Sequence, residues 1–432
     1  MDNDALALAQ SDLLDARLGP FFYCPPNYLV DAGSEYVPIR VGSLKHRLRK
    51  LFPAHEVNDA MTTIEDCRFV SYAGPLAGKD RGLHESADGR KLLATTSPTV
   101  ISASPGAFPT IELFLEQLLV SGGVDQRPYF FGWLNCARAA MLERKPTPGH
   151  LLGLAGPRGS GKTQLIGLIE LAMGGRRANP RDYFCGGRFN ADLLAAELLV
   201  LDDEDVPAKE AARQAFKQRI KNFLYCGSPR IEAKHKDAFT FPGVWRAVVA
   251  CNDAEDDLRA LPAVDDGSQD KLLYLMCAHA FPEVLSDDDF QDWQRIVRAE
   301  LPAFLHFIEN YEIPQHLRAS RGRIVAWQHP LLLEKIHSLD GWLVLMELVD
   351  VAAGASVMSL PWKGKARELE TILTGHYETE RHAKKLFGNW HAKAGVLLSE
   401  AATHSERVYV AGKSGKIKTY RIEPDEGEPC ES

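Results

Sequence analysis

The chain has 432 residues, which at roughly 100–200 residues per domain predicts two to four domains. Hydrophobic residues make up 45% of it and charged residues 25%, so it can bury a sizeable core and wholesale disorder is excluded. The formal net charge of −8 argues against a protein that coats nucleic acid with its whole surface, but it leaves room for a local basic channel.

Targeting and redox signals favour a cytoplasmic protein without a membrane partner. No apolar run approaches the ~18 residues that a membrane span needs. The N-terminal segment carries Asp2 and Asp4 where a signal peptide would carry Lys or Arg. The eight cysteines are sparse and none forms a CxxC pair, which fits a reduced compartment better than a disulfide scaffold or a zinc ribbon.

Residues 1–122 are predicted to form a mixed α/β N-terminal domain without a chemical motif. Strand-like runs at Arg68–Tyr72 and Lys91–Thr95 lie between turns that are rich in Gly and Pro. A helix is expected over Pro109–Val120, because its apolar residues recur on one face.

Residues 123–325 alternate apolar strands with amphipathic helices, which predicts an α/β domain whose parallel sheet is covered on both faces. The expected strands are His150–Ala155, Leu198–Leu201 and Val244–Cys251. The expected helices are Lys162–Met173, which Gly174 ends, and Pro207–Tyr225.

The strongest motif joins the first of these strands to the first helix. Residues 156–163 read Gly-Pro-Arg-Gly-Ser-Gly-Lys-Thr and match GxxxxGK[ST], the P-loop pattern. The glycines let backbone N–H groups point at phosphate oxygens, and the helix N-terminus favours the anion. Lys162 is expected to reach the β- and γ-phosphates of ATP, and Thr163 to bind Mg²⁺. The predicted nucleotide-binding residues are Gly156, Pro157, Arg158, Gly159, Ser160, Gly161, Lys162, Thr163 and Gln164.

Polar residues end the next two strands. Asp202 is predicted to hold the metal and Asp203 to polarise the attacking water, a role that falls to Glu204 if the strand ends one residue later. Asn252, at the end of a strand expected between the P-loop and acidic strands, could hydrogen-bond the γ-phosphate and the water. Without the upstream loop, a solvated turn is the ordinary explanation for such residues.

A basic hairpin is expected between the acidic strand and Asn252. Arg230–Ala233 and Ala238–Phe241 can pair, with Lys234, His235 and Lys236 near the tip. These three side chains suit DNA phosphates, which they bind without reading sequence. The alternative is a solvated hairpin turn.

Residues 326–432 are predicted to form a winged-helix-like domain. Helices are expected at Pro361–Thr374, Glu378–Phe387 and Asn389–His404, followed by strands at Arg407–Val410 and Lys416–Ile422 that turn around Gly412 to Gly415. Its expected DNA contacts are Lys413, Lys416 and Lys418. A small packing domain with a solvated positive face is the alternative.

The order of P-loop, acidic strand, lysine-bearing hairpin and Asn-ended strand resembles superfamily 3 helicases. That family includes the replicative helicases of papillomaviruses and polyomaviruses and the D5-like primase–helicases of poxviruses and phages. Residues 221–252 are similar to its B′ and C motifs, including the Lys-His pair. Segments elsewhere look like phage primase–helicases: 72–78, 105–109, 362–370 and 407–422. We find no paired acids of a primase upstream, so the chain resembles the helicase part alone.

The resemblance implies an AAA+ homo-hexamer with ATP and Mg²⁺ between subunits. Each hairpin would grip single-stranded or forked DNA in a central pore and move it in the 3′ to 5′ direction, alongside a separate primase or replication initiator. The resemblance also implies that the neighbouring subunit supplies a basic residue, usually Arg, to the ATP between subunits. Lys271 stands in that position, and Arg259 is the alternative, since lysine lacks the bidentate fork of arginine.

Three functions remain open on the sequence. The first is an ATP-dependent DNA helicase in the replication of a phage or mobile genetic element. The second is an ATPase of assembly or defence that switches partners without unwinding DNA. The third is a P-loop kinase with Lys271 in a lid. The basic hairpin argues against this third function, because it would have no purpose in a kinase.

Overall fold

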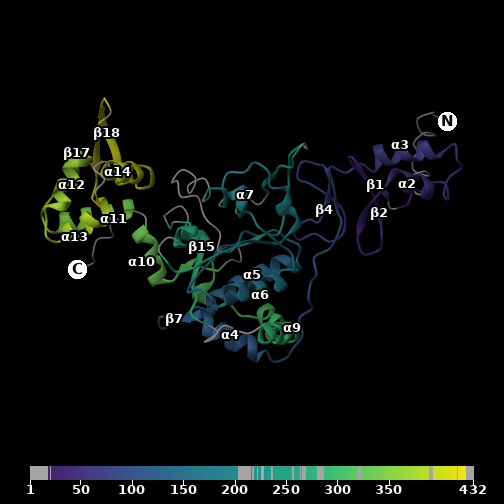
Figure 1. Cartoon of the computed structure of the whole chain (residues 1–432), viewed down its shortest axis with the longest axis horizontal. Coiled ribbons are helices and arrows are strands. Elements are labelled where there is room, and N and C mark those ends of the chain that lie inside the picture. The colour runs from purple at the N-terminus through teal and green to yellow at the C-terminus, as the bar shows by residue number, and fades with distance from the viewer. Residues whose placement is uncertain are drawn as a thin grey trace. The chain divides into compact units, whose positions relative to one another are not determined.

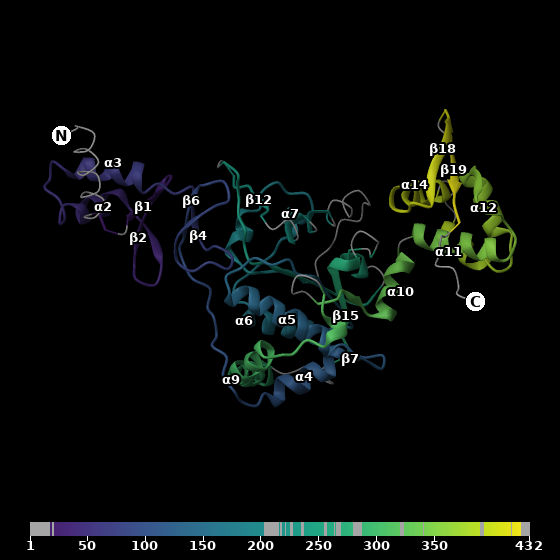
Figure 2. The same cartoon turned by 180° about the vertical axis from the view of Figure 1, so that it is seen from behind.

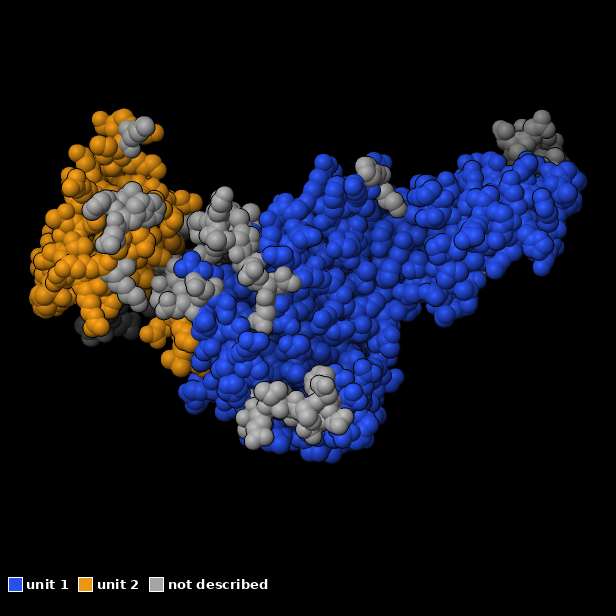
Figure 3. Space-filling model, viewed as in Figure 1, with its two compact units in different colours: residues 1–262, 270–327 blue, residues 263–269, 328–432 orange. Residues whose placement is uncertain are grey.

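The computed structural model describes residues 18–19, 21–202, 216, 218–220, 222–224, 228–234, 237–254, 257–262, 264, 269–279, 287–319, 324–339, 341–388, 393–415 and 417–424. The chain divides into two compact units (Figure 3): unit 1 is Met1–Pro262 with Asp270–Trp327, and unit 2 is Ala263–Gln269 with Gln328–Ser432. Unit 1 spans both the predicted N-terminal domain and the predicted ATPase domain, whose boundary at 122/123 stays a prediction.

The N-terminal part of unit 1 begins with an antiparallel three-stranded sheet under two helices (Figure 1). The strands are β1 (Phe21–Cys24), β2 (Asn27–Asp31) and β3 (Tyr36–Ile39), and the helices are α2 (Val41–Leu48) and α3 (Val57–Cys67). Leu44 and Leu48 of α2 pack with Ile64 of α3 and Phe21 of β1 in a buried cluster. This cluster gives the region an apolar core of its own.

A second small sheet follows, in the order β4 (Tyr72–Gly74), β6 (Lys91–Ala94), β5 (Gly82–Glu85). The strand expected at Lys91–Thr95 is confirmed as β6. The strand expected at Arg68–Tyr72 is wrong, because α3 continues to Cys67 and the chain makes an isolated bridge from Phe69 to Tyr23 before β4 begins.

The centre of unit 1 is a six-stranded sheet in the order β10-β11-β14-β9-β15-β16. Its strands are β9 (Leu151–Ala155), β10 (Arg177–Ala178), β11 (Leu198–Asp202), β14 (Arg246–Cys251), β15 (Leu272–Met276) and β16 (Trp327–Gln328). All neighbours from β10 to β15 pair in parallel, and β9 and β14 are buried along their whole length. The predicted α/β class with a parallel sheet is confirmed.

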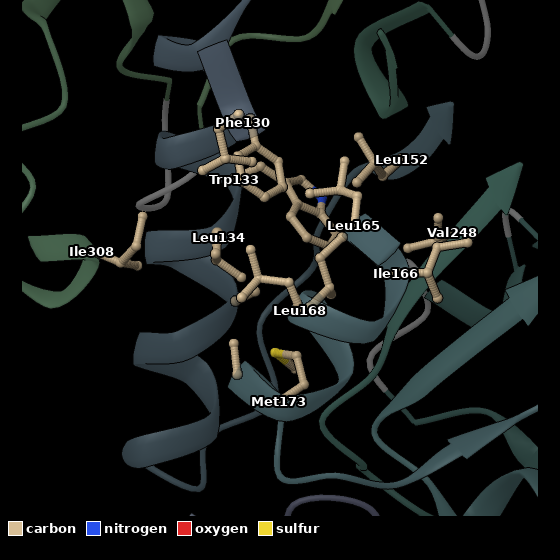
Figure 4. Close-up of a cluster of buried hydrophobic side chains, with 14 of the residues drawn as sticks. Phe130, Trp133, Leu134, Leu152, Leu165, Ile166, Leu168, Met173, Val248 and Ile308 are labelled. Carbon is tan, nitrogen blue, oxygen red and sulfur yellow. The ribbon is translucent and has the colours of Figure 1, made fainter. Parts of the chain in front are cut away.

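Helices α4 (Pro109–Leu119), α5 (Arg127–Leu142), α6 (Lys162–Ala172) and α9 (Asp287–Glu309) share the largest apolar core with this sheet. Helices α5 and α6 lie side by side beneath the sheet in both views (Figures 1 and 2). Trp133 and Leu134 of α5 point at Leu165 and Leu168 of α6 (Figure 4). Burial of each such side chain contributes roughly 1.5–3 kcal/mol, so α6 is held firmly where its N-terminus meets the sheet edge.

Shorter elements of unit 1 connect these parts. They are the paired strands β7 (Val120–Ser121) and β8 (Val124–Asp125), helix α7 (Arg181–Phe184), the paired strands β12 (Arg230–Ile231) and β13 (Phe239–Thr240), and the 3₁₀ turns η1 (Ala191–Ala195), η2 (Asp257–Ala260), η3 (Gln269–Lys271) and η4 (Gln315–Leu317). The expected helices at Pro109–Val120 and Lys162–Met173 are confirmed as α4 and α6. Of the helix expected at Pro207–Tyr225, only residues 216, 218–220 and 222–224 are described, and they are helical.

Unit 2 combines helices with a three-stranded antiparallel sheet. The helices are α10 (Pro330–Leu339), α11 (Gly341–Gly354), α12 (Ala366–Thr374), α13 (Glu380–Phe387) and α14 (Lys393–His404), and the sheet order is β17 (Trp362–Lys365), β19 (Ile417–Ile422), β18 (Val408–Ser414). The expected helix from Pro361 is wrong in its first turn, because Trp362–Lys365 pairs with β19. Gly415, at φ 62°, makes the turn, whereas Gly412 lies inside β18 beside a shift in register.

The helices that the structure describes include none with both the length and the apolarity of a bilayer span.

Candidate functional site

Four parallel strands end together at one edge of the central sheet, which we call the loop edge. The loop 156–163 follows β9, Asp202 ends β11, Asn252 follows β14 and Cys277 follows β15. The register brings these ends level, since both Cys251 and Met276 pair with Ala155. The strand that ends in Asn252 lies between β9 and β11, as the sequence predicted. The carboxyl ends of parallel strands are where open α/β sheets bind their ligands.

Glycines shape the loop. Gly159 and Gly161 have φ of 73° and 111°, in the left-handed region that side chains disfavour. Gly156 packs against the residue that follows β15, where an added Cβ atom would clash with the carbonyl oxygen of Cys277. The loop is therefore held by backbone contacts at its start and turns sharply at its end, as a phosphate-binding loop requires.

Lys162 lies inside the loop and is only 5% exposed. Its Nζ donates hydrogen bonds to the carbonyl oxygens of Gly156 at 2.8 Å and Pro157 at 2.9 Å, and to Oδ1 of Asn252 at 3.4 Å. The hydrogen bond to Asn252 joins two side chains that were both predicted from the sequence to contact the γ-phosphate. A buried ammonium held by three neutral oxygens is a strong local positive charge for an anion.

Thr163 and Asp202 also meet at the loop edge. Thr163 Oγ1 donates a hydrogen bond to Asp202 Oδ2 at 3.3 Å, and the threonine is exposed. Hydroxyl and carboxylate oxygens are the hard ligands that Mg²⁺ prefers, so this pair fits the predicted metal. Ser160 Oγ is buried in the loop without a hydrogen-bond partner, so its hydroxyl is available for a hydrogen bond to a bound ligand. Asp203 and Glu204, the candidates for the base, lie outside the described residues.

The thiol of Cys277 lies beside the loop and is unreactive. Burial raises its pKa to about 12, while the nearby Lys162 charge acts in the opposite direction. The side chain therefore stays a neutral thiol at physiological pH and contributes packing rather than chemistry.

A pocket of about 290 Å³ runs beside α6 from the loop edge. It shares Thr163 and Gln164 with the loop, and Trp293 and Arg298 of α9 line its other side together with Arg177. Sequence reasoning missed these last three residues, because they come from distant segments and carry no motif.

The two candidates for the basic residue that would act on a neighbouring subunit lie on different 3₁₀ turns. Lys271 precedes β15, at the end opposite the loop edge, where its Nζ is 2.7 Å from Asp270 Oδ1. Arg259 lies in η2, which follows Asn252 in the chain and contacts β14. Within its own chain, Lys271 is therefore not brought to the cluster of Lys162, Asn252 and Asp202.

The basic hairpin is anchored at its base. β12 pairs antiparallel with β13, and Ile231 and Phe239 are buried. The Asn190 side chain donates to the Arg230 carbonyl at 3.0 Å and accepts from the Glu232 N–H at 2.7 Å. Lys234 is exposed in the connection, whereas His235 and Lys236 lie outside the described residues.

In unit 2, the β18–β19 hairpin carries two described lysines that were predicted to contact DNA. Lys413 and Lys418 are exposed and directly opposite each other in the register, with Lys418 Nζ 3.3 Å from Ser399 Oγ. Like charges placed opposite each other favour a nearby anion. Tyr420 is 3% exposed, so it cannot stack on a base. Lys416 lies outside the described residues.

Comparison with known proteins supports the fold. A family of unknown function, DUF5906, matches residues 154–266, which contain the loop, β11, the hairpin and Asn252. No curated protein matches the chain. The apo structure of the NrS-1 C-terminal region (305–718) aligns over 98% of this chain and 100% of its own, with a TM-score of 0.56 at 13% identity.

A second apo structure of the NrS-1 region, its A form, aligns over 96% of this chain and 98% of its own, with a TM-score of 0.54 at 13% identity. At this identity the likeness establishes a shared fold and nothing more. The active helicase Cch of SCCmec type IV covers 90% of this chain and 73% of its own at 10% identity, but its TM-score of 0.31 is too low to support an argument.

Proposed function

We propose that the chain is an ATP-dependent DNA helicase of the superfamily 3 type, which hydrolyses ATP at the loop edge and moves along single-stranded DNA in the 3′ to 5′ direction. The observation that carries the proposal is the convergence of Lys162, Asn252, Thr163 and Asp202 on one sheet edge. Replication of a phage or mobile element, assembly as a hexamer, and work beside a primase or initiator belong to the same proposal.

The side chains at the loop edge divide the work on the triphosphate. Lys162 would leave the Gly156 and Pro157 carbonyls for the β- and γ-phosphate oxygens, because phosphate offers it full negative charge. Thr163 and Asp202 would hold Mg²⁺, which neutralises charge on the phosphates when it is bound. Asn252, already in contact with Lys162, would orient the γ-phosphate and the attacking water. Asp203 or Glu204 would accept the proton of that water.

The DNA contacts proposed are Lys234, His235 and Lys236 on the hairpin, and Lys413, Lys416 and Lys418 in unit 2. In unit 2, the helices α12, α13 and α14 are followed by the β18–β19 hairpin, an order that supports a winged helix and a duplex contact near a fork. The exposed Lys234, on a hairpin fixed by Asn190, suits a grip on the phosphate backbone.

Nucleotide turnover tests the site. Lys162→Ala should lower kcat for ATP at least ~100-fold, and Asn252→Ala by a similar factor with ATP affinity largely retained, because each removes a donor aimed at developing charge. Steady-state kinetics and calorimetric titration of a slowly hydrolysed ATP analogue measure the two effects. Lys145→Ala, an exposed change outside the loop edge, is the control. Unchanged turnover in Lys162→Ala would refute the proposed site.

DNA unwinding separates the helicase from an ATPase that only switches partners. We expect the wild type to unwind forked duplexes that carry a 3′ tail, and Lys234→Ala/His235→Ala to lose unwinding while keeping basal ATPase activity. ATPase activity that does not respond to single-stranded DNA, together with no unwinding of duplexes that carry 3′ or 5′ tails, would favour the ATPase that only switches partners.

A further inference from the structure

A cationic surface on the N-terminal part of unit 1 has no part in the proposed site. Residues 40–50 contain five Lys or Arg and no acid, in a chain whose net charge is −8. These residues span α2 and its two flanks, and we call them the α2 surface: Arg40, Lys45, Arg47, Arg49 and Lys50, together with His46.

Helix geometry gathers these charges toward solvent. Leu44 and Leu48, four residues apart and both fully buried, fix the face of α2 that packs on the core. From Lys45 to Lys50, every position except Leu48 is basic or histidine, and all of these are exposed or half-buried. The solvent side of the last turn is therefore uniformly positive.

The cations of the α2 surface have no acidic partners among the residues that the structure describes. On nearby α3, Glu65 accepts a hydrogen bond from Tyr28, and among the described residues no ion pair joins Asp59 or Asp66 to the α2 surface. The helix dipole favours cations near the C-terminus of α2, but it opposes Arg40 at the N-cap. Helix stability thus does not account for the whole cluster, whose charges repel one another unless a polyanion neutralises them.

We infer that the α2 surface binds the phosphate backbone of duplex DNA without reading its sequence. A lipid bilayer fits less well, because the apolar face that a membrane-bound helix inserts is already buried in the core. Single-stranded nucleic acid fits less well, because residues 40–50 contain no Phe, Tyr or Trp on which bases could stack. The inference rests on the proposed DNA-directed function and adds a contact that precedes the ATPase core in the chain.

The test compares two variants that each remove two positive charges. Arg47→Gln/Lys50→Gln alters the α2 surface, and Lys79→Gln/Lys145→Gln alters other cations of unit 1. Affinity of the full chain for a 20-base-pair duplex is measured by fluorescence anisotropy, without nucleotide and over a series of salt concentrations. We expect only the α2 variant to lose affinity, roughly tenfold, and its slope of log affinity against log salt to fall by about 2. Thermal unfolding should be unchanged, since both side chains are exposed.

Each other outcome overturns the inference. Equal losses in the two variants would mean a general effect of net charge. A loss confined to a single-stranded oligonucleotide would exclude the duplex as the ligand. If the α2 variant binds the duplex as tightly as the wild type but no longer prefers phosphatidylserine vesicles to phosphatidylcholine vesicles, the surface is a membrane contact. Because the measurement omits nucleotide, its failure leaves ATP turnover and unwinding, the tests of the proposed function, unaffected.

Discussion

At the scale of single residues, the loop edge depends on contacts between backbone segments that are far apart in the chain. Gly156 lies against the carbonyl of Cys277, and its own N–H donates to the Cys251 carbonyl at 3.4 Å. The first residue of the loop is therefore fixed by β14 and β15 at once. The motif needs glycine here for packing, beyond the flexibility that glycine supplies elsewhere in the loop.

Gly156→Ala should destabilise the protein by about 1–3 kcal/mol and weaken ATP binding, because the added Cβ meets rigid backbone. Gly167→Ala is a matched control in α6, where nothing beyond the neighbouring residues and the backbone of the helix itself lies within 4 Å of the added Cβ. There we expect stability to rise by up to ~1 kcal/mol, since alanine favours the helix. Thermal unfolding and nucleotide titration of both variants measure this. A Gly156→Ala protein as stable as Gly167→Ala would contradict the observed packing.

At the scale of elements, a buried ion pair attaches the N-terminal part of unit 1 to β10 and β11, the strands at one side of the central sheet. Glu197, just before β11, is fully buried and accepts hydrogen bonds from Arg176 Nε at 2.9 Å and from the Gly78 N–H at 2.8 Å. Arg176 Nη2 donates in turn to the Leu76 carbonyl at 3.1 Å. The segment around Gly78 is thereby held against β10 and β11 through charged hydrogen bonds.

Glu197→Gln should lower the stability of unit 1 by about 3 kcal/mol, because it leaves the Arg176 charge in a buried site without its counter-ion. Glu232→Gln is the control, as its partners Arg188 and Arg230 are 80% and 73% exposed and water solvates their charges when the carboxylate is lost. Urea unfolding followed by tryptophan fluorescence should show a clearly lower midpoint for Glu197→Gln alone. Equal midpoints for the two variants would contradict the role assigned to Glu197.

At the scale of the whole molecule, unit 2 has its own apolar core. Leu345 and Val349 of α11 pack with Leu369 of α12, Leu398 of α14 and Ile422 of β19. Its three-stranded sheet is formed within the unit, since β19 pairs with both β17 and β18. A core shared by several helices and a sheet is what an independently folding unit requires.

Residues 328–432 should therefore fold alone, with a helical circular dichroism spectrum and one cooperative thermal transition. Leu398→Ala should lower that transition clearly, because deleting a buried leucine costs about 2–5 kcal/mol. A broad, non-cooperative melt of the wild-type fragment would show that residues 328–432 need other parts of the chain in order to fold.

Much of the candidate site was readable from the sequence because it is encoded locally. The spacing within residues 156–163 and the apolar runs before Asp202 and Asn252 each lie within a single short segment. Buried strands read as continuous apolar runs, and the parallel arrangement of such strands brings their ends to one edge. The convergence of Lys162 with Asn252 follows from these two regularities.

Tertiary structure alone decided the features that depend on partners distant in the chain. Trp362–Lys365 is a strand because β19 supplies its hydrogen bonds, although the segment by itself suggested a helix. The α2 surface became visible only when burial of Leu44 and Leu48 showed which side of that helix faces water. Local spacing determines where a loop or helix can form, whereas pairing and burial are set by contacts between segments that no local pattern records.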